Sequence, residues 1–134
     1  MFFVVRRATL LIPSGTVDDP ERRHLFICLT DPVNEERDTL LVSVSSVRPG
    51  LPHDSTCRLF AGDHPFIRHD SFVAYRLMRI EPAAALERGV QNGVLLPREI
   101  LDGGLFARVC KGLTESRFVT PAILDFYLAA TAEE

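Results

Sequence analysis

Short runs of aliphatic and β-branched residues, separated by turn-forming residues, fill the first 80 positions of the chain. Runs of this length, bounded by Pro, Gly, Ser and Asp, are typical of β-strands. Because consecutive runs are joined by loops, antiparallel pairing is the simplest topology. The run at residues 24–30 is almost wholly apolar, which indicates a central strand buried on both faces. The pattern predicts strands at residues 2–12, 24–30, 39–46, 57–60 and 71–80.

Beyond the last predicted strand, the spacing of apolar residues becomes helical. Residues 83–89 fit a helical turn, and residues 97–112 carry apolar side chains at helix-like spacings. Thr120 and Pro121 suit the N-cap and the first position of a terminal helix at 120–128. Strands followed by helices predict an α+β domain, mainly β, or a barrel capped by helices, rather than a doubly wound sheet.

Length and composition indicate one ordinary globular domain. The 134 residues fit a single domain over residues 1–134, with the strands at about 1–80 and the helical part at about 83–130. Hydrophobic residues make up 46% and charged residues 25%, a composition that favours neither a disordered chain nor a membrane protein. A net charge of -3 excludes a globally basic nucleic-acid binder, although it leaves room for a local basic groove.

The N-terminus and the cysteines bear on the compartment. The apolar residues 1–5 precede Arg6 and Arg7, which is the reverse of the order in a signal peptide, so we expect a cytoplasmic protein without a membrane partner. The 3 cysteines are widely spaced and form no CxxC pair, which argues against a disulfide framework and a zinc ribbon. We therefore expect free thiols at Cys28, Cys57 and Cys110.

No standard catalytic motif occurs in the sequence: it has no Gly-rich phosphate loop, GxSxG elbow, HExxH pair or CxxC zinc site. Its polar side chains instead gather in three clusters next to predicted strands, at residues 22–24, 43–46 and 63–71. Strand ends and loops held by a rigid scaffold are where functional sites are usually built. Each cluster also has a purely structural interpretation.

The first two clusters carry basic and hydroxyl side chains that suit a phosphate. His24 can move a proton near neutral pH, and Arg23 can contact a phosphate oxygen. Ser45 and Ser46 can donate hydrogen bonds to the same group. The structural alternatives are a solvated charged turn for the first cluster and ordinary turn-forming serines for the second.

The third cluster has two compatible interpretations. We expect His64, Arg68 and His69 to line a substrate groove. The segment also suits a structural connection, in which Asp63 caps a turn and the apolar residues that follow anchor the loop in the core. Those anchoring residues are Pro65, Phe66 and Ile67.

A metal site is a further alternative for the third cluster, with a metal hydrolase as the function. Asp54, Cys57, Asp63 and His64 would be its ligands. The spacing of His64 and His69 brings the two rings together on neither a helix nor a strand. We therefore predict no metal and no cofactor.

Three stretches of the chain resemble the PemK/MazF family of bacterial toxin endoribonucleases. They correspond to an apolar strand that follows a basic residue, a strand that ends in Ser or Thr, and a later barrel strand. Members of this family are compact SH3-like barrels that cut single-stranded RNA without a metal. The resemblance covers about residues 5–80 and implies a small SH3-like antiparallel β-barrel with C-terminal helices. The matching residues are 23–30, 40–46 and 71–75.

The resemblance also implies the site residues. His24 stands at the position of the family's catalytic arginine, with Arg23 directly before it, and Ser45 stands at the Ser/Thr position. These three are the implied catalytic residues. Leu25 and Ser43 stand where the family has two prolines. The predicted substrate-binding residues are Ser46, His64, Arg68 and His69.

The predicted function is that of a toxin-type, metal-independent endoribonuclease. Its substrate would be single-stranded RNA, its partner an antitoxin protein and its assembly a homodimer. The alternative is a non-catalytic SH3-like barrel that binds a protein or nucleic-acid partner, which the departures at His24, Leu25 and Ser43 favour. Clustering of His24, Arg23 and Ser45 on one concave surface would favour catalysis, and their dispersal would favour binding alone.

Overall fold

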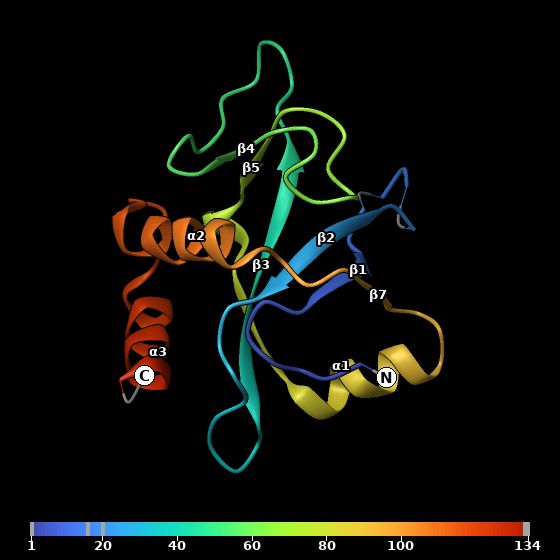
Figure 1. Ribbon diagram of the computed structural model, residues 1–134, viewed down its shortest axis with the longest axis vertical. Coiled ribbons are helices and arrows are strands. Elements are labelled where there is room, and N and C mark those ends of the chain that lie inside the picture. The colour runs from blue at the N-terminus through green and yellow to red at the C-terminus, as the bar shows by residue number, and fades with distance from the viewer. Residues whose placement is uncertain (1, 16, 20, 133–134) are drawn as a thin grey trace.

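The computed structural model describes residues 2–15, 17–19 and 21–132. Within these residues the chain forms one antiparallel sheet of seven strands, together with three α-helices (Figure 1). The predicted α+β, mainly β class is therefore confirmed. The strands are β1 (Thr9–Pro13), β2 (Arg23–Cys28), β3 (Asp38–Ser46), β4 (Arg58–Leu59), β5 (Ser71–Val73), β6 (Arg79–Pro82) and β7 (Leu96–Arg98).

Strand β3 organises the sheet. One of its edges pairs with β2, and the other pairs with β6 near its N-terminal end and with β5 near its C-terminal end. The main path through the sheet runs β4-β5-β3-β2-β1-β7. In the described part of the chain β4 and β7 are the outer strands and do not pair with each other, so the predicted closed barrel is wrong. These strands have 2 and 3 residues, too few for a ladder that would close the sheet.

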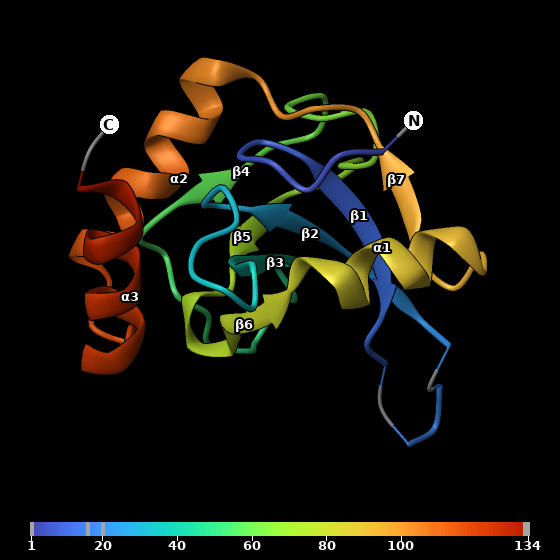
Figure 2. The same cartoon turned by 90° about the horizontal axis from the view of Figure 1, so that it is seen from below.

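Alternate side chains of the strands enter two separate hydrophobic cores. Leu25 of β2 belongs to the core that α2 (Gly103–Glu115) covers, while its neighbour Phe26 belongs to the core that α1 (Ala83–Gln91) covers. Figure 2 shows the two helices on separate sides of the sheet. The helices contribute the buried side chains of Ala83, Leu86, Leu105, Val109 and Leu113.

The strand predicted at residues 71–80 is interrupted. Its first part forms β5 and its last part forms β6, and between them Tyr75–Leu77 make one 3-10 turn. The turn carries the Tyr75 ring into the core beneath α2, where its hydroxyl donates a 2.6 Å hydrogen bond to the carbonyl of Val109. Both parts still pair with the same edge of β3. The interruption therefore joins the sheet to the helix.

The segment after residue 82 is mostly helical but also contributes a strand. Residues 97–112, predicted as helical, begin in β7, and the helix α2 starts later, with Asp102 as its N-cap. The terminal helix α3 (Pro121–Thr131) begins as predicted, because the Thr120 side chain accepts a hydrogen bond from the Ile123 amide. Among the described residues, no helix is long and apolar enough to cross a membrane.

Candidate active site

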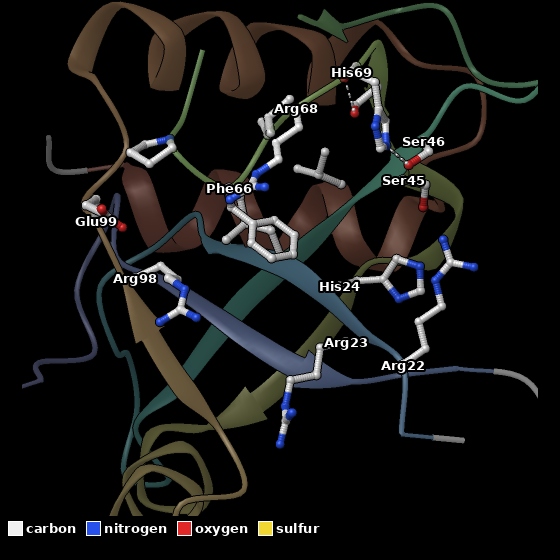
Figure 3. A pocket seen from close by; sticks show the side chains of 15 residues that line it. Arg22, Arg23, His24, Ser45, Ser46, Phe66, Arg68, His69, Arg98 and Glu99 are labelled. Atoms are coloured by element: carbon white, nitrogen blue, oxygen red, sulfur yellow. Dashed lines mark hydrogen bonds between the residues drawn. The ribbon is translucent and has the colours of Figure 1, made fainter. Parts of the chain in front are cut away.

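A pocket of about 550 Å³ opens where β2 begins and β3 ends (Figure 3). The loop before β5 and the end of β7 complete its walls. It gathers six of the seven residues that the sequence predicts for the site, all except His64. The lining residues are Arg22, Arg23, His24, Leu25, Val44, Ser45, Ser46, Pro65, Phe66, Ile67, Arg68, His69, Ser71, Arg98 and Glu99.

Strand register brings the two central residues of the site together. Leu25 of β2 pairs with Val44 of β3, so one step further along the same antiparallel register places His24 opposite Ser45. Side chains of directly opposed residues lie on the same face of a sheet, with Cβ atoms about 4.5–5.5 Å apart. The predicted clustering of His24 and Ser45 is therefore a direct result of how β2 and β3 pair.

The hydrogen bonds of His24 define the form of its ring. Its Nδ1 atom lies 2.6 Å from the Ser14 hydroxyl, and that hydroxyl donates its own proton to the Ile12 carbonyl, 3.1 Å away. We assign the single hydroxyl proton of Ser14 to the Ile12 carbonyl, and with that assignment Ser14 accepts from Nδ1–H. A neutral ring held in this way keeps a lone pair on Nε2, which is the requirement for a general base.

The surroundings of His24 favour its neutral form. The side chain is half-buried, and its pKa is lowered below 6.5 by this burial first and then by the positive charges of Arg22 and Arg48. The ring is therefore mainly uncharged at neutral pH. Burial, charge and the bond to Ser14 all favour the same protonation state.

The arginines of the pocket differ in how near they lie to His24 and Ser45. Figure 3 shows the guanidinium of Arg22 beside the His24 ring, on the side toward Ser45, while the Arg23 side chain extends away from both. Arg23 still lines the pocket, together with Arg68 and Arg98. Four arginines thus face one glutamate in the lining, an excess of positive charge in a chain whose net charge is -3. This excess suits an anionic group such as a phosphate.

A second imidazole lies in the same pocket. The Nε2 atom of His69 is 2.7 Å from the hydroxyl of Ser46, and the His69 side chain is exposed. His69 lies on the same loop as Arg68 and Phe66. The pocket therefore holds two histidines, His24 on the β2 side and His69 on the loop side, each bonded to a serine hydroxyl.

His64 does not line the pocket but lies behind it, with 2% of its surface exposed. Its Nε2 atom lies 2.7 Å from the Glu99 carbonyl oxygen, which can only accept, and its Nδ1 accepts from the Phe66 amide at 3.0 Å. The ring is therefore a neutral connector between the loop and the residue that follows β7. Predicted to bind substrate, His64 instead has both ring nitrogens occupied by the backbone.

The loop that carries these residues combines the two predicted interpretations. Asp63 accepts a 2.8 Å hydrogen bond from the Phe60 amide, and Ile67 is buried, as a structural connection requires. Phe66, predicted to enter the core, is 40% exposed and lines the pocket instead. Arg68 and His69 follow it in the lining.

Three charged lining residues, Arg22, Arg98 and Glu99, are not among the site residues predicted from the sequence. Arg98 is the last residue of β7 and Glu99 follows it, in a segment whose spacing predicts a helix. Arg22 stands beside the predicted Arg23 and His24. The register of the β1–β2 hairpin, had it been known, could have told which of Arg22 and Arg23 lies next to His24 in the site. In that register the Ser14 amide donates a hydrogen bond to the Arg22 carbonyl.

Three of the four residues considered as metal ligands, Asp54, Asp63 and His64, have hydrogen-bond partners elsewhere. Asp54 accepts hydrogen bonds from Thr56 and from the Ser116 hydroxyl at 2.7 Å, and the carboxylate of Asp63 accepts from the Phe60 amide. Cys57 is a buried free thiol. The described residues contain no group of three or more His, Cys, Asp or Glu side chains arranged to hold a metal ion.

Comparison of the chain with family models, with curated proteins and with solved structures finds no match.

Proposed function

We propose that the pocket cleaves single-stranded RNA without a metal, through attack of a ribose 2'-hydroxyl on the adjacent phosphate. One observation carries the proposal: a neutral His24 with a free Nε2 lies beside Ser45 in a pocket lined by four arginines. This arrangement supplies a base for the hydroxyl and positive charge for the phosphate. A cytoplasmic location, as the sequence predicts, would give access to RNA.

His24 acts as the general base. Its Nε2 takes the proton of the 2'-hydroxyl as the 2'-oxygen forms a bond to phosphorus. The Ser14 hydroxyl holds Nδ1–H, so the ring presents the correct nitrogen, and the developing imidazolium keeps that hydrogen bond.

His69 acts as the general acid. In its protonated form it gives a proton to the 5'-oxygen as the bond between phosphorus and that oxygen breaks. One proton is taken and one is returned, so the products are a 2',3'-cyclic phosphate and a 5'-hydroxyl end. The hydrogen bond to Ser46 orients the ring on the loop side of the pocket.

Arginines of the pocket and Ser45 stabilise negative charge on the phosphate. Arg22 lies beside His24 and is the guanidinium best placed for the phosphate oxygens as negative charge develops on them. Ser45 donates a hydrogen bond to the same group, while Arg23 and Arg68 bind the phosphate from the rim. Arg22 thus shares the role predicted for Arg23, which is to stabilise negative charge on the phosphate.

The resemblance to PemK/MazF toxins supports the same reaction. The stretches that carry it include β2, most of β3 and β5, the strands that hold His24, Ser45 and Ser46. An SH3-like ancestry, an antitoxin partner and a homodimer belong to this proposal. Because the family has an arginine at the position of His24, the proposed mechanism assigns the base to a histidine and the charge to Arg22.

An RNA cleavage assay tests the proposal. We expect the purified chain to cut single-stranded RNA equally with and without EDTA, and to leave cyclic phosphate ends. His24→Ala should lower kcat/KM by about 10²- to 10⁴-fold, the usual contribution of a general base. Arg88→Ala is the matched control, because Arg88 is exposed on α1 and does not line the pocket.

Three outcomes would overturn the proposal: RNA left intact, loss of cleavage in EDTA, or full activity in His24→Ala. RNA that is bound but never cut would favour the alternative, a non-catalytic binding module. The departures from the family at Leu25 and Ser43 favour that alternative. Binding and cleavage measured on the same RNA separate the two functions.

A further inference from the structure

A second pocket, of about 640 Å³, meets the first at Ser45. Ser45 lines both pockets, and a smaller hollow of about 210 Å³ shares His24 and Ser45 with the first and His53 and Phe72 with the second. The two pockets are therefore adjacent. The second is lined by Ser45, Pro52, His53, Asp54, Ser55, Thr56, Phe72, Ala74, Arg76, Leu77, Glu115, Arg117 and Phe118.

The aromatic ring of Phe72 lies directly beside the proposed reaction centre. Phe72 of β5 pairs with Ser45 of β3, so their side chains are neighbours on one face of the sheet. The ring of His53 packs on Phe72, with centroids 5.2 Å apart and planes inclined by 34°. His24, Ser45 and Phe72 thus follow one another across three neighbouring strands.

Guanidinium and aromatic groups also meet on the far wall of the second pocket. The guanidinium carbons of Arg76 and Arg117 lie 4.3 Å and 5.0 Å from the centre of the Phe118 ring. Planar groups of both kinds are the surfaces on which proteins stack unpaired nucleobases. This wall is built from η1 (Tyr75–Leu77) and from the residues between α2 and α3.

The charges of the two pockets differ. The first has four arginines and one glutamate, whereas the second has two arginines and two acidic residues, Asp54 and Glu115. A balanced, aromatic pocket is a poor site for a phosphate and a good one for a base. Carboxylates accept hydrogen bonds from the amino groups of bases.

We propose that the second pocket binds the nucleobase next to the cleaved phosphate, stacked against the rings that begin at Phe72. The single strand then crosses Ser45, with its phosphate in the basic pocket and its base in the aromatic one. This inference rests on the proposed function, since it assigns the phosphate to the first pocket.

The test uses a single-stranded DNA oligonucleotide that contains 2-aminopurine. DNA lacks the 2'-hydroxyl, so it binds without being cut, and the fluorescence of 2-aminopurine is quenched when the base stacks. We expect the full chain to quench it. Phe72→Leu and Phe118→Leu should each weaken binding about 5- to 150-fold, because stacking on one aromatic side chain contributes about 1–3 kcal/mol. Phe72→Tyr and Phe118→Tyr keep the ring and should bind like the parent chain.

The outcomes separate the two proposals. Absence of quenching by the parent chain, or equal affinity in the Leu and Tyr variants, overturns the base site whether or not RNA is cut. Quenching that depends on the rings supports the base site even if RNA stays intact, in which case the cleavage proposal alone fails. Phe118 lies in the connection between α2 and α3, so its variants provide a test that does not disturb the sheet.

Discussion

The imidazole of His24 has one ring nitrogen committed to Ser14 and one available. This assignment follows from the single proton of the Ser14 hydroxyl, which goes to the Ile12 carbonyl. Burial and two nearby arginines then lower the pKa of the ring. The chemistry of this residue is thus set by groups that only folding brings near it.

Substitution of Arg22 by Gln should raise the pKa of His24 toward 6.5, because it removes a neighbouring positive charge that disfavours the imidazolium. The change should be partial, since burial is the larger cause and remains. The acid limb of kcat/KM, which lies below pH 6.5 in the parent chain because the base must be neutral, should move to higher pH. NMR titration of the His24 ring measures the same pKa without relying on activity.

The control for this experiment is Arg88→Gln, which removes an exposed positive charge far along the chain on α1. The pKa of His24 should not change in that variant. A pKa that falls or stays constant in Arg22→Gln would contradict the contact between Arg22 and His24.

At the scale of elements, a close contact joins η1 to α2. The Tyr75 hydroxyl bonds the Val109 carbonyl, and Gly112 lies one helical turn further on. A Cβ atom at Gly112 would collide with the Tyr75 hydroxyl. The glycine is therefore required by packing rather than by backbone conformation.

We expect Gly112→Ala to lower the free energy of unfolding by about 1–3 kcal/mol, the usual cost of overpacking a core. Urea denaturation measures this cost. Gly103→Ala in the same helix is the matched control, because the nearest atoms to its Cβ would be at 3.7 Å or more. The cost should shrink in a Tyr75→Phe background, which removes the colliding hydroxyl. Equal stability of the two alanine variants would refute the packing argument.

Elements with strong local signals were predictable from the sequence. The strands around His24 and Ser45 and the capped helix at Thr120 follow directly from apolar runs and cap residues. The interruption of residues 71–80 was not predictable, because both halves read as strand and only the contact of Tyr75 with α2 separates them. The sequence pattern did not predict the strand β7, because this strand has only 3 residues and is stabilised by its pairing with β1.

The site shows the same division between local and long-range information. His24, Ser45 and His69 were predictable because they lie at strand ends and in the adjoining loop. Arg98 and Glu99 were not, since their position depends on β7. Burial of His64 depends on a carbonyl 35 positions away, which no local pattern records.

For the whole molecule, local charge should outweigh net charge in binding a nucleic acid. The chain carries a net charge of -3, yet the first pocket presents four arginines and one glutamate. A single-stranded oligonucleotide bound there releases counterions from each phosphate that is neutralised.

We expect the affinity for single-stranded DNA to fall as salt rises, with a slope of log K against log salt of about -0.7 for each phosphate contacted and at most about -2.8 for four arginines. Titrations between about 50 and 200 mM salt measure this slope. Arg68→Gln should make it less steep by about 0.7 if this side chain contacts a phosphate. An affinity that does not depend on salt would contradict binding in the basic pocket.

The His64 ring joins the Phe66 amide to the Glu99 carbonyl, so the loop and the residue after β7, which both line the pocket, are tied to each other before any ligand arrives. The conformational entropy of ordering this loop is consequently lost during folding and not during binding. A ligand then meets a preorganised cavity, and its association should need little rearrangement of the backbone. The buried histidine thus contributes to affinity without touching the ligand.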